Sequence, residues 1–174
     1  MLDIAVAYNR FKFLGEEFLT WLWFVIDQDP KILRQVDPDI TSLEIGNRIV
    51  LEKRHKKTLE RITIKGENAG LEEAMLALQK GALVAELSLI YRSAQQKWQF
   101  TLKGESLNLS RMKTPKIAAP KSSDDMEGFI LEKIFLYDKI LQFIEKLYKT
   151  FIKYRLSNQW EKRDTALIKK WYRS

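Results

Sequence analysis

The sequence has no cysteine and only one histidine among its 174 residues. Without cysteine, the chain can form neither a disulfide framework nor a thiolate metal site, and it has no Cys nucleophile. A reducing compartment is the simplest setting for this composition, so we expect a cytoplasmic protein. The histidine, His55, lies inside the basic run 53–57, where the surrounding positive charge disfavours a divalent metal and a catalytic role.

Long apolar runs are also missing. The longest apolar cluster, residues 18–26, is about half the length that spans a bilayer, so we expect a buried helix there. The N-terminal stretch breaks its apolar run at Asn9 and Arg10, unlike a secretory signal. We therefore expect no membrane partner. Attachment of the basic aromatic segment 169–173 to an anionic membrane surface is the alternative reading.

Catalytic motifs are absent from the sequence as well. It contains no Gly-rich phosphate loop, no nucleophile elbow and no metalloprotease helix motif. Its acidic pairs, Glu16-Glu17, Glu72-Glu73 and Asp124-Asp125, consist of adjacent residues, which do not share a helix face. Each pair also lies where a helix is expected to begin. We predict that the protein is not an enzyme and uses no metal or other cofactor.

Positive charge is what the sequence has in excess. The formal net charge is +7, and residues 146–173 alone hold nine basic residues against two acidic ones. Such asymmetry suggests a polyanionic partner or surface, although basic residues near a helix end also complement the helix dipole. A second cluster, residues 53–57, places four cations in five positions between two predicted strands.

This second cluster is the candidate binding site. A basic loop beside a basic strand face can hold phosphates without reading base sequence, whereas a solvated lysine-rich loop is the alternative. The candidate DNA-binding residues are Lys53, Arg54, Lys56, Lys57, Arg61 and Lys65, with Lys162, Arg163, Lys169 and Lys170 as a secondary basic surface. Trp98 and the aromatic residues of 18–26 could stack on bases, but their periodicity favours the core.

The sequence of the first part of the chain predicts short helices and strands. A helix is expected over 18–26, with Glu16-Glu17 in its first turn and Asp29-Pro30 at its end. The pair Gly46-Asn47 between two alternating runs predicts a β-hairpin within 42–52. The remaining expected elements are a strand at 59–65 with Ile62 and Ile64 inward, a helix at 71–80 ended by Gly81, a hairpin of strands 83–91 and 98–103, and an edge strand at 107–109.

The second part carries the strongest periodic signal. Apolar residues spaced alternately by four and three are Ile130, Ile134, Tyr137, Leu141, Ile144, Tyr148 and Phe151. They predict an amphipathic helix of about eight turns. The wide stripe favours packing on its own domain, and a coiled coil with another chain is the alternative. After Ser157-Asn158, a second amphipathic segment at 166–172 is expected to fold back.

These elements predict an α+β fold with a small, mostly antiparallel sheet and packing helices, followed by a long C-terminal amphipathic helix and a short terminal helix. The expected division is an α+β domain at 1–111, an exposed connection at 112–126 and a helical region at 127–174 packed on the first part. A chain of this length is able to bury a substantial core.

Three stretches of the sequence are similar to the C-terminal half of the RdgC family, the bacterial recombination-associated DNA-binding proteins. They are residues 13–23 (FLGEEFLTWLW), residues 64–84, and residues 98–103 together with 107–115. The resemblance covers roughly residues 10–156. It implies non-enzymatic, largely sequence-independent binding of double-stranded or single-stranded DNA in the nucleoid, by a dimer that closes into a positively charged ring.

The resemblance carries over one site residue and also has departures. Lys65 matches a basic residue that family members use near DNA, whereas Gly66 replaces a polar residue found in some relatives. The chain lacks the N-terminal half that contributes to the family's ring, so the resemblance does not extend to a ring formed by this polypeptide alone. A homodimer and a separate protein that supplies this half are the further partners to consider. The alternative function is a protein–protein interaction module that uses the long helix and has no nucleic-acid role.

Overall fold

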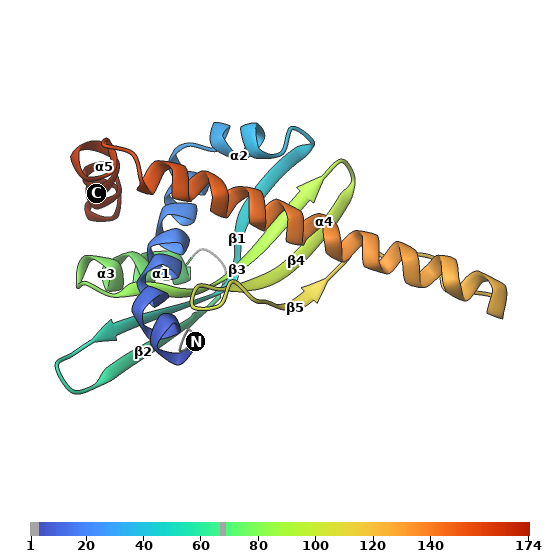
Figure 1. Cartoon of the computed structure of the whole chain (residues 1–174), viewed down its shortest axis with the longest axis horizontal. Coiled ribbons are helices and arrows are strands. Elements are labelled where there is room, and N and C mark those ends of the chain that lie inside the picture. The colour runs from blue at the N-terminus through green and yellow to red at the C-terminus, as the bar shows by residue number, and fades with distance from the viewer. Residues whose placement is uncertain (1–3, 67–68) are drawn as a thin grey trace.

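The computed structural model describes residues 4–66 and 69–174 and has an α+β fold, as predicted (Figure 1). Side chains are described for residues 12–66 and 71–174. The elements in chain order are α1 (Ile4–Gln28), α2 (Lys31–Val36), β1 (Ile40–Arg54), β2 (Leu59–Lys65), α3 (Ala69–Gln79), β3 (Leu83–Ser93), β4 (Gln96–Lys103), β5 (Leu109–Lys113), α4 (Ser123–Arg155), the π-helical turn η1 (Trp160–Asp164) and α5 (Thr165–Arg173).

The five strands form one antiparallel sheet in the order β2-β1-β3-β4-β5. The predicted hairpin turn at Gly46-Asn47 is wrong, because both residues lie inside the continuous strand β1. Residues 46–48 instead form a bulge opposite Ser88 of β3. A Cβ atom on Gly46 would lie 2.5 Å from the Ser88 hydroxyl oxygen, so the glycine serves a close approach between strands and not a turn.

The other strand predictions hold, with shifted ends. In β2 the side chain of Ile64 is buried and that of Ile62 is half-buried, whereas Arg61, Thr63 and Lys65 are exposed, as predicted. The turn that follows α3 contains Gly81 with a φ of +86°, in the region that favours glycine. The edge strand β5 runs over Leu109–Lys113 and so begins two residues later than 107.

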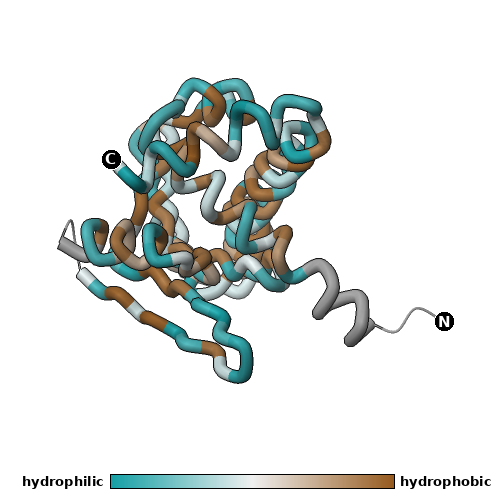
Figure 2. The backbone as a smooth tube through the Cα atoms, turned by 90° about the vertical axis from the view of Figure 1, so that its left-hand side faces the viewer, coloured by the Kyte–Doolittle hydropathy of each residue, from teal (hydrophilic) through white to brown (hydrophobic). Residues whose placement is uncertain are grey.

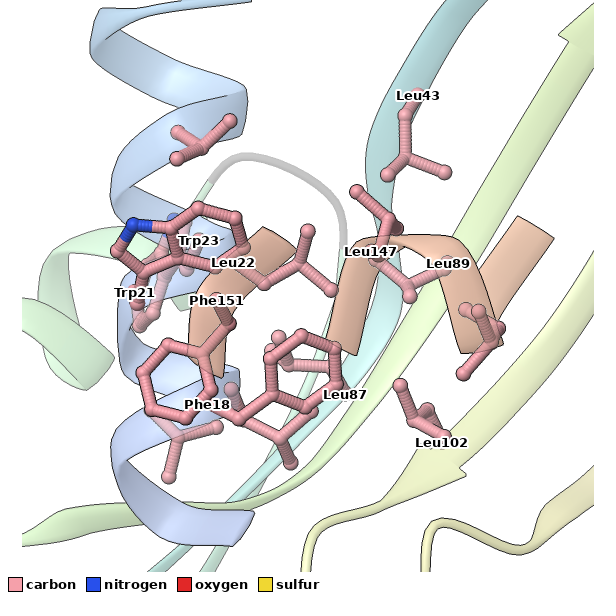
Figure 3. Packing of buried hydrophobic residues seen from close by; sticks show 14 of the residues in the cluster. Phe18, Trp21, Leu22, Trp23, Leu43, Leu87, Leu89, Leu102, Leu147 and Phe151 are labelled. Carbon is pink, nitrogen blue, oxygen red and sulfur yellow. The ribbon is translucent and has the colours of Figure 1, made fainter. Parts of the chain in front are cut away.

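The core lies between one face of the sheet and the helices α1 and α4 (Figure 3). Leu87, Leu89 and Leu102 of the central strands face Phe18 and Phe151, and all five are fully buried. The Phe18 and Phe151 rings lie 5.5 Å apart, which joins the first helix to the long C-terminal helix. Burial on this scale holds the sheet and helices together.

Trp98 confirms its predicted place in the core. Its side chain is fully buried, and its indole nitrogen donates a hydrogen bond of 3.0 Å to the carbonyl oxygen of Leu136 in α4. The aromatic residues of α1 are also in the core, where Trp21 and Trp23 are both buried. None of these three rings is exposed to stack on bases.

Helix α1 is much longer than expected. It ends at Gln28, before Asp29-Pro30 as predicted, but it already includes Ile4. Glu16 and Glu17 therefore lie in the helix interior and not in its first turn, which corrects that prediction. Both carboxylates form ion pairs with distant residues, Glu16 with Arg54 and Glu17 with Arg155 at 2.7 Å.

Helix α4 begins at Ser123, so the segment between β5 and α4 is shorter than the predicted connection 112–126. The Ser122 hydroxyl caps α4 by accepting a hydrogen bond from the Asp125 amide. The predicted single core stripe is wrong for its first half. Ile130, Ile134 and Leu141 are 50%, 59% and 52% exposed, whereas the residues of α4 that are buried are Leu136, Ile140, Phe143, Ile144, Leu147 and Phe151.

This division follows from the shape of the molecule, because the first half of α4 extends beyond the sheet (Figure 1). After α4 the chain folds back through η1 into α5, as predicted for 166–172. The Trp171 indole nitrogen anchors α5 by donating to the Asp27 carboxylate at 2.7 Å. Among the described residues, no helix combines the length and apolar character needed to cross a bilayer.

Candidate nucleic-acid interface

The β1–β2 hairpin presents the basic cluster predicted from the sequence. Figure 2 shows the hairpin extending away from the body, with a hydrophilic tip. Lys56 and Lys57 are exposed in the loop between the strands, and Lys53 is half-buried near the end of β1. Within the part of the chain that the structure describes, these lysines form no ion pair. The tip therefore holds positive charge that is available to an anion.

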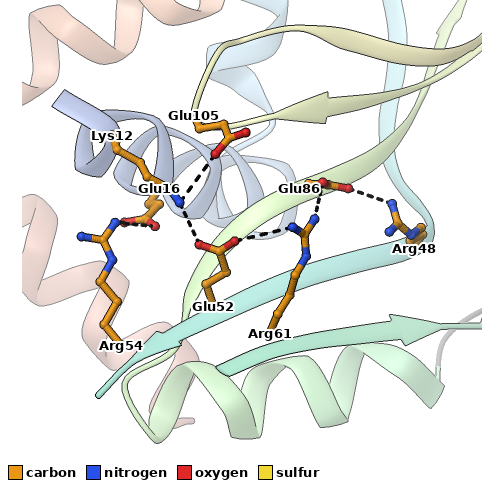
Figure 4. Close-up of polar contacts among 8 residues, drawn as sticks. All are labelled: Lys12, Glu16, Arg48, Glu52, Arg54, Arg61, Glu86 and Glu105. Carbon is orange, nitrogen blue, oxygen red and sulfur yellow. Dashed lines mark hydrogen bonds and ion pairs between the residues drawn. The ribbon is translucent and has the colours of Figure 1, made fainter. Parts of the chain in front are cut away.

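Two of the six candidate residues are already paired with carboxylates (Figure 4). Arg54 Nη2 lies 3.2 Å from Glu16, and Arg61 Nη2 lies 2.5 Å from Glu86. Arg61 also approaches Glu52 at 3.8 Å. Because an arginine that neutralises a protein carboxylate has less charge to offer a phosphate, these two residues are weaker candidates than the free lysines. Their DNA-binding role stays a prediction.

These pairs belong to a larger ion-pair network across α1, β1, β2 and β3. Lys12 bridges Glu52 at 3.2 Å and Glu105 at 3.6 Å, while Arg48 donates to Glu86 at 2.7 Å. The network contains four basic and four acidic side chains, drawn together in Figure 4. It is therefore neutral by formal charge, and its physical role is to pair buried carboxylates.

Glu16 is the most enclosed carboxylate of this network, with 1% of its surface exposed. Burial raises its pKa above the ordinary value of 4.5, while the charges of Arg54 and Lys12 oppose that rise. From the sequence, Glu16 was expected at a helix start, and Glu52 and Glu86 were not singled out. A signal was present for both, because each interrupts an apolar strand, after Ile49-Val50-Leu51 and Val84-Ala85 respectively.

Lys65 lies at the end of β2 and is exposed. The next residue, Gly66, has a φ of +132°, a conformation that L side chains rarely adopt. A polar residue at this position would strain the backbone, so the departure from the RdgC pattern coincides with a local requirement for glycine. Lys65 also lacks an ion-pair partner among the described residues.

The secondary basic surface lies at the same end of the molecule as the hairpin. Lys162, Lys169 and Lys170 are exposed, and Arg163 contacts Asp164 at 3.1 Å. Figure 1 places α5, α3 and the hairpin tip along one end, with α3 between the other two. The two basic surfaces are therefore separated by α3, whose Glu72 and Glu73 are exposed acids.

Metal-ligating side chains do not gather among the described residues. No group of three metal-ligating side chains is found among them. His55 is exposed at the hairpin tip, where its Nε2 lies 3.3 Å from a carboxylate oxygen of the exposed Glu60. No protein-family model matches this sequence, and no curated protein matches it significantly.

Proposed function

We propose that this protein binds DNA without catalysing a reaction and with little preference for base sequence. The observation that carries the proposal is the extended β1–β2 hairpin, whose Lys53, Lys56 and Lys57 have no carboxylate partner in the described chain. The major groove of B-form DNA admits a two-stranded β-ribbon, so a hairpin is a suitable shape for this contact. The resemblance to the RdgC family supports the same function.

The proposed mechanism is neutralisation of phosphates. Each lysine that contacts a phosphate releases condensed counterions, so affinity should fall steeply with salt. Lys65 would extend the contact along β2, and the basic surface of η1 and α5 at the same end would add a second contact. The hairpin sequence from 40 to 65 contains no Phe, Tyr or Trp, which fits contacts to the phosphate backbone and not base stacking.

The test is a fluorescence-anisotropy titration against labelled duplex and single-stranded DNA at several salt concentrations. The hairpin variant is Lys56→Ser with Lys57→Ser. The matched control is Lys116→Ser with Lys121→Ser, which removes the same charge from exposed positions between β5 and α4. The logarithm of the duplex-DNA binding constant should fall less steeply with the logarithm of the salt concentration in the hairpin variant. The slope should become shallower by about 1.8, or ~0.9 for each of two phosphates that are no longer neutralised.

The control separates a localised interface from general charge. Equal reductions of affinity in both variants would show that the hairpin is not the binding surface. Absence of binding at low salt would overturn DNA binding altogether. In that case the alternative function moves to first place.

One observation favours that alternative, a protein–protein interaction module. The extended half of α4 exposes Leu131, Ile134 and Phe135 by 59%, 59% and 67%. Sedimentation velocity of the wild type and of Ile134→Gln with Phe135→Gln tests whether this face mediates self-association. Phe151 is unsuitable for such a test, because it is fully buried in the core. A monomer in both samples would remove the self-association version.

A further inference from the structure

A small hollow lies on the sheet face opposite the core, between two irregular strand segments. One is the β1 bulge, where residues 46–48 oppose Ser88. The other is in β5, where residues 111–112 lie between the pairs Gln99–Lys113 and Thr101–Ser110. The hollow has a volume of about 200 Å³. This is below the ~300–1,000 Å³ of most small-molecule pockets and suits a small ion or group.

The lining of this hollow is basic and rich in hydrogen-bond donors. Among the described residues, Arg111 and Lys113 supply unpaired positive charge, Arg48 adds a guanidinium whose charge Glu86 neutralises, and no carboxylate lines the hollow. Ser88 and Thr101 are direct partners in the β3–β4 register and provide two neighbouring hydroxyl groups. In the described chain, neither hydroxyl has a side-chain hydrogen-bond partner. Guanidinium, ammonium and hydroxyl donors are the groups that bind oxyanions.

The Arg48 side chain has donor capacity that the protein does not use. A terminal nitrogen of Arg48 donates to Glu86 at 2.7 Å, but the Nε of Arg48 is buried and has no hydrogen-bond partner. A buried donor without an acceptor is costly and calls for an explanation. Because this Nε is closed to solvent, it can donate to an oxyanion only after the Arg48 side chain moves; as it stands, Arg48 lines the hollow while paired with Glu86.

Arg111 adds a second, independent observation. Its φ is +53°, in the left-handed region that non-glycine residues seldom occupy. Such a conformation is energetically unfavourable for a residue with a side chain and is concentrated at functional sites, ligand clamps among them. The β5 irregularity thus directs an arginine to the hollow at a conformational cost, and bulges commonly redirect side chains in this way. Arg111 and Lys113 are exposed and form no ion pair with any described residue.

We propose that this hollow is a binding site for a single phosphate group. The site is separate from the hairpin tip and does not depend on the proposed DNA contact there. Its ligand is either a free phosphate or phosphomonoester, or a phosphodiester of a nucleic-acid backbone. Both present negatively charged phosphoryl oxygens to Arg48, Arg111 and Lys113, so the experiment has to separate them.

The test is a titration of ¹⁵N-labelled protein with inorganic phosphate, followed by amide chemical shifts, with chloride keeping the ionic strength constant. The site variant is Arg111→Gln with Lys113→Gln, and Lys113→Gln alone is a milder second variant. Lys116→Gln with Lys121→Gln is the charge-matched control. We expect saturable shifts around residues 47–48 and 111–113, and at least about tenfold weaker binding for each charged hydrogen bond removed.

Two further arms identify the source of the phosphate. Displacement of inorganic phosphate by an oligodeoxynucleotide without a terminal phosphate would assign the site to phosphodiesters. Displacement only by a 5′-phosphorylated strand would assign it to monoesters. The Lys56→Ser, Lys57→Ser variant should bind phosphate as the wild type does, which separates this proposal from the hairpin proposal. Unsaturable shifts spread over many lysines, or equal binding by the site variant and the control, would overturn the phosphate site.

Discussion

Replacement of Gly15 by alanine tests the close backbone approach of Gly15 to Gly104. Gly15 lies within α1, and a Cβ atom there would be 1.7 Å from the carbonyl oxygen and 2.3 Å from the carbonyl carbon of Gly104. Ordinary contact begins at 3.4 Å, so α1 and the segment after β4 would have to separate by about 1.7 Å. No side-chain rotation relieves the clash, because the atoms on both sides belong to the backbone.

Gly15→Ala has both a destabilising and a stabilising effect on the free energy of unfolding. Overpacking typically costs ~1–3 kcal/mol, and the upper end applies here because Leu19 and its neighbours on α1 are fully buried. Replacing glycine by alanine inside a helix stabilises the folded state by about 1 kcal/mol. We therefore expect Gly15→Ala to lower the free energy of unfolding by roughly 2 kcal/mol, and the melting temperature by about 4–8 °C.

The assay is urea unfolding followed by tryptophan fluorescence, with Gly128→Ala as the matched control. Gly128 also lies in a helix, but a Cβ atom there would have no neighbour within 4 Å. This control should gain about 0.5–1 kcal/mol of stability. The two substitutions thus have opposite expected signs. If Gly15→Ala is as stable as Gly128→Ala, the close approach of α1 to Gly104 is refuted.

Three further predictions concern α4, the sheet and the buried carboxylate. In urea unfolding, Phe143→Ala should lower the free energy of unfolding by about 3–5 kcal/mol, because this side chain is only 2% exposed. Phe135 is 67% exposed, so Phe135→Ala should change that free energy by about 0.5 kcal/mol or less. Equal destabilisation by the two substitutions would contradict the division of α4 into an exposed and a buried half. Trp98→Phe removes the indole donor to the Leu136 carbonyl together with part of a fully buried side chain, and should cost about 1–3 kcal/mol. Differential scanning calorimetry that shows no change would contradict this bond. Burial raises the pKa of Glu16 in the folded state above 4.5, so the unfolded state loses this proton at a lower pH than the folded state does. The stability of the wild type should therefore fall relative to that of Glu16→Gln as the pH rises from 4.5 to the raised pKa. Parallel pH profiles of the unfolding free energy for the two proteins would contradict the raised pKa.

Local sequence signals located most of the elements. Alternation of apolar residues located β3 and β4, and the good helix formers before Gly81 located α3. These predictions succeed because the periodicity of an element reflects which of its faces is buried. The basic run at 53–57 was also visible in the sequence, although only residues 55–57 lie in the loop and Lys53 and Arg54 belong to β1.

Long-range pairing settled what local patterns left open. The Gly46-Asn47 pair has the chemistry of a hairpin turn, yet β1 pairs with β3 on both sides of it, and a side chain on the glycine would meet Ser88. Likewise, Arg54 and Arg61 read as free cations until the fold brings buried carboxylates beside them. Sequence distance conceals such partners, because the ion pairs join residues on different elements.

The seven-residue apolar stripe of α4 shows the same limit at the scale of a whole helix. Its spacing repeats along the entire stripe, which is enough to identify an amphipathic helix without any knowledge of the fold. That Phe151 is buried and Ile134 exposed follows instead from packing between elements. The reason is physical: periodicity records that a helix has an apolar face, but the extent of the sheet and α1 determines how much of that face is covered.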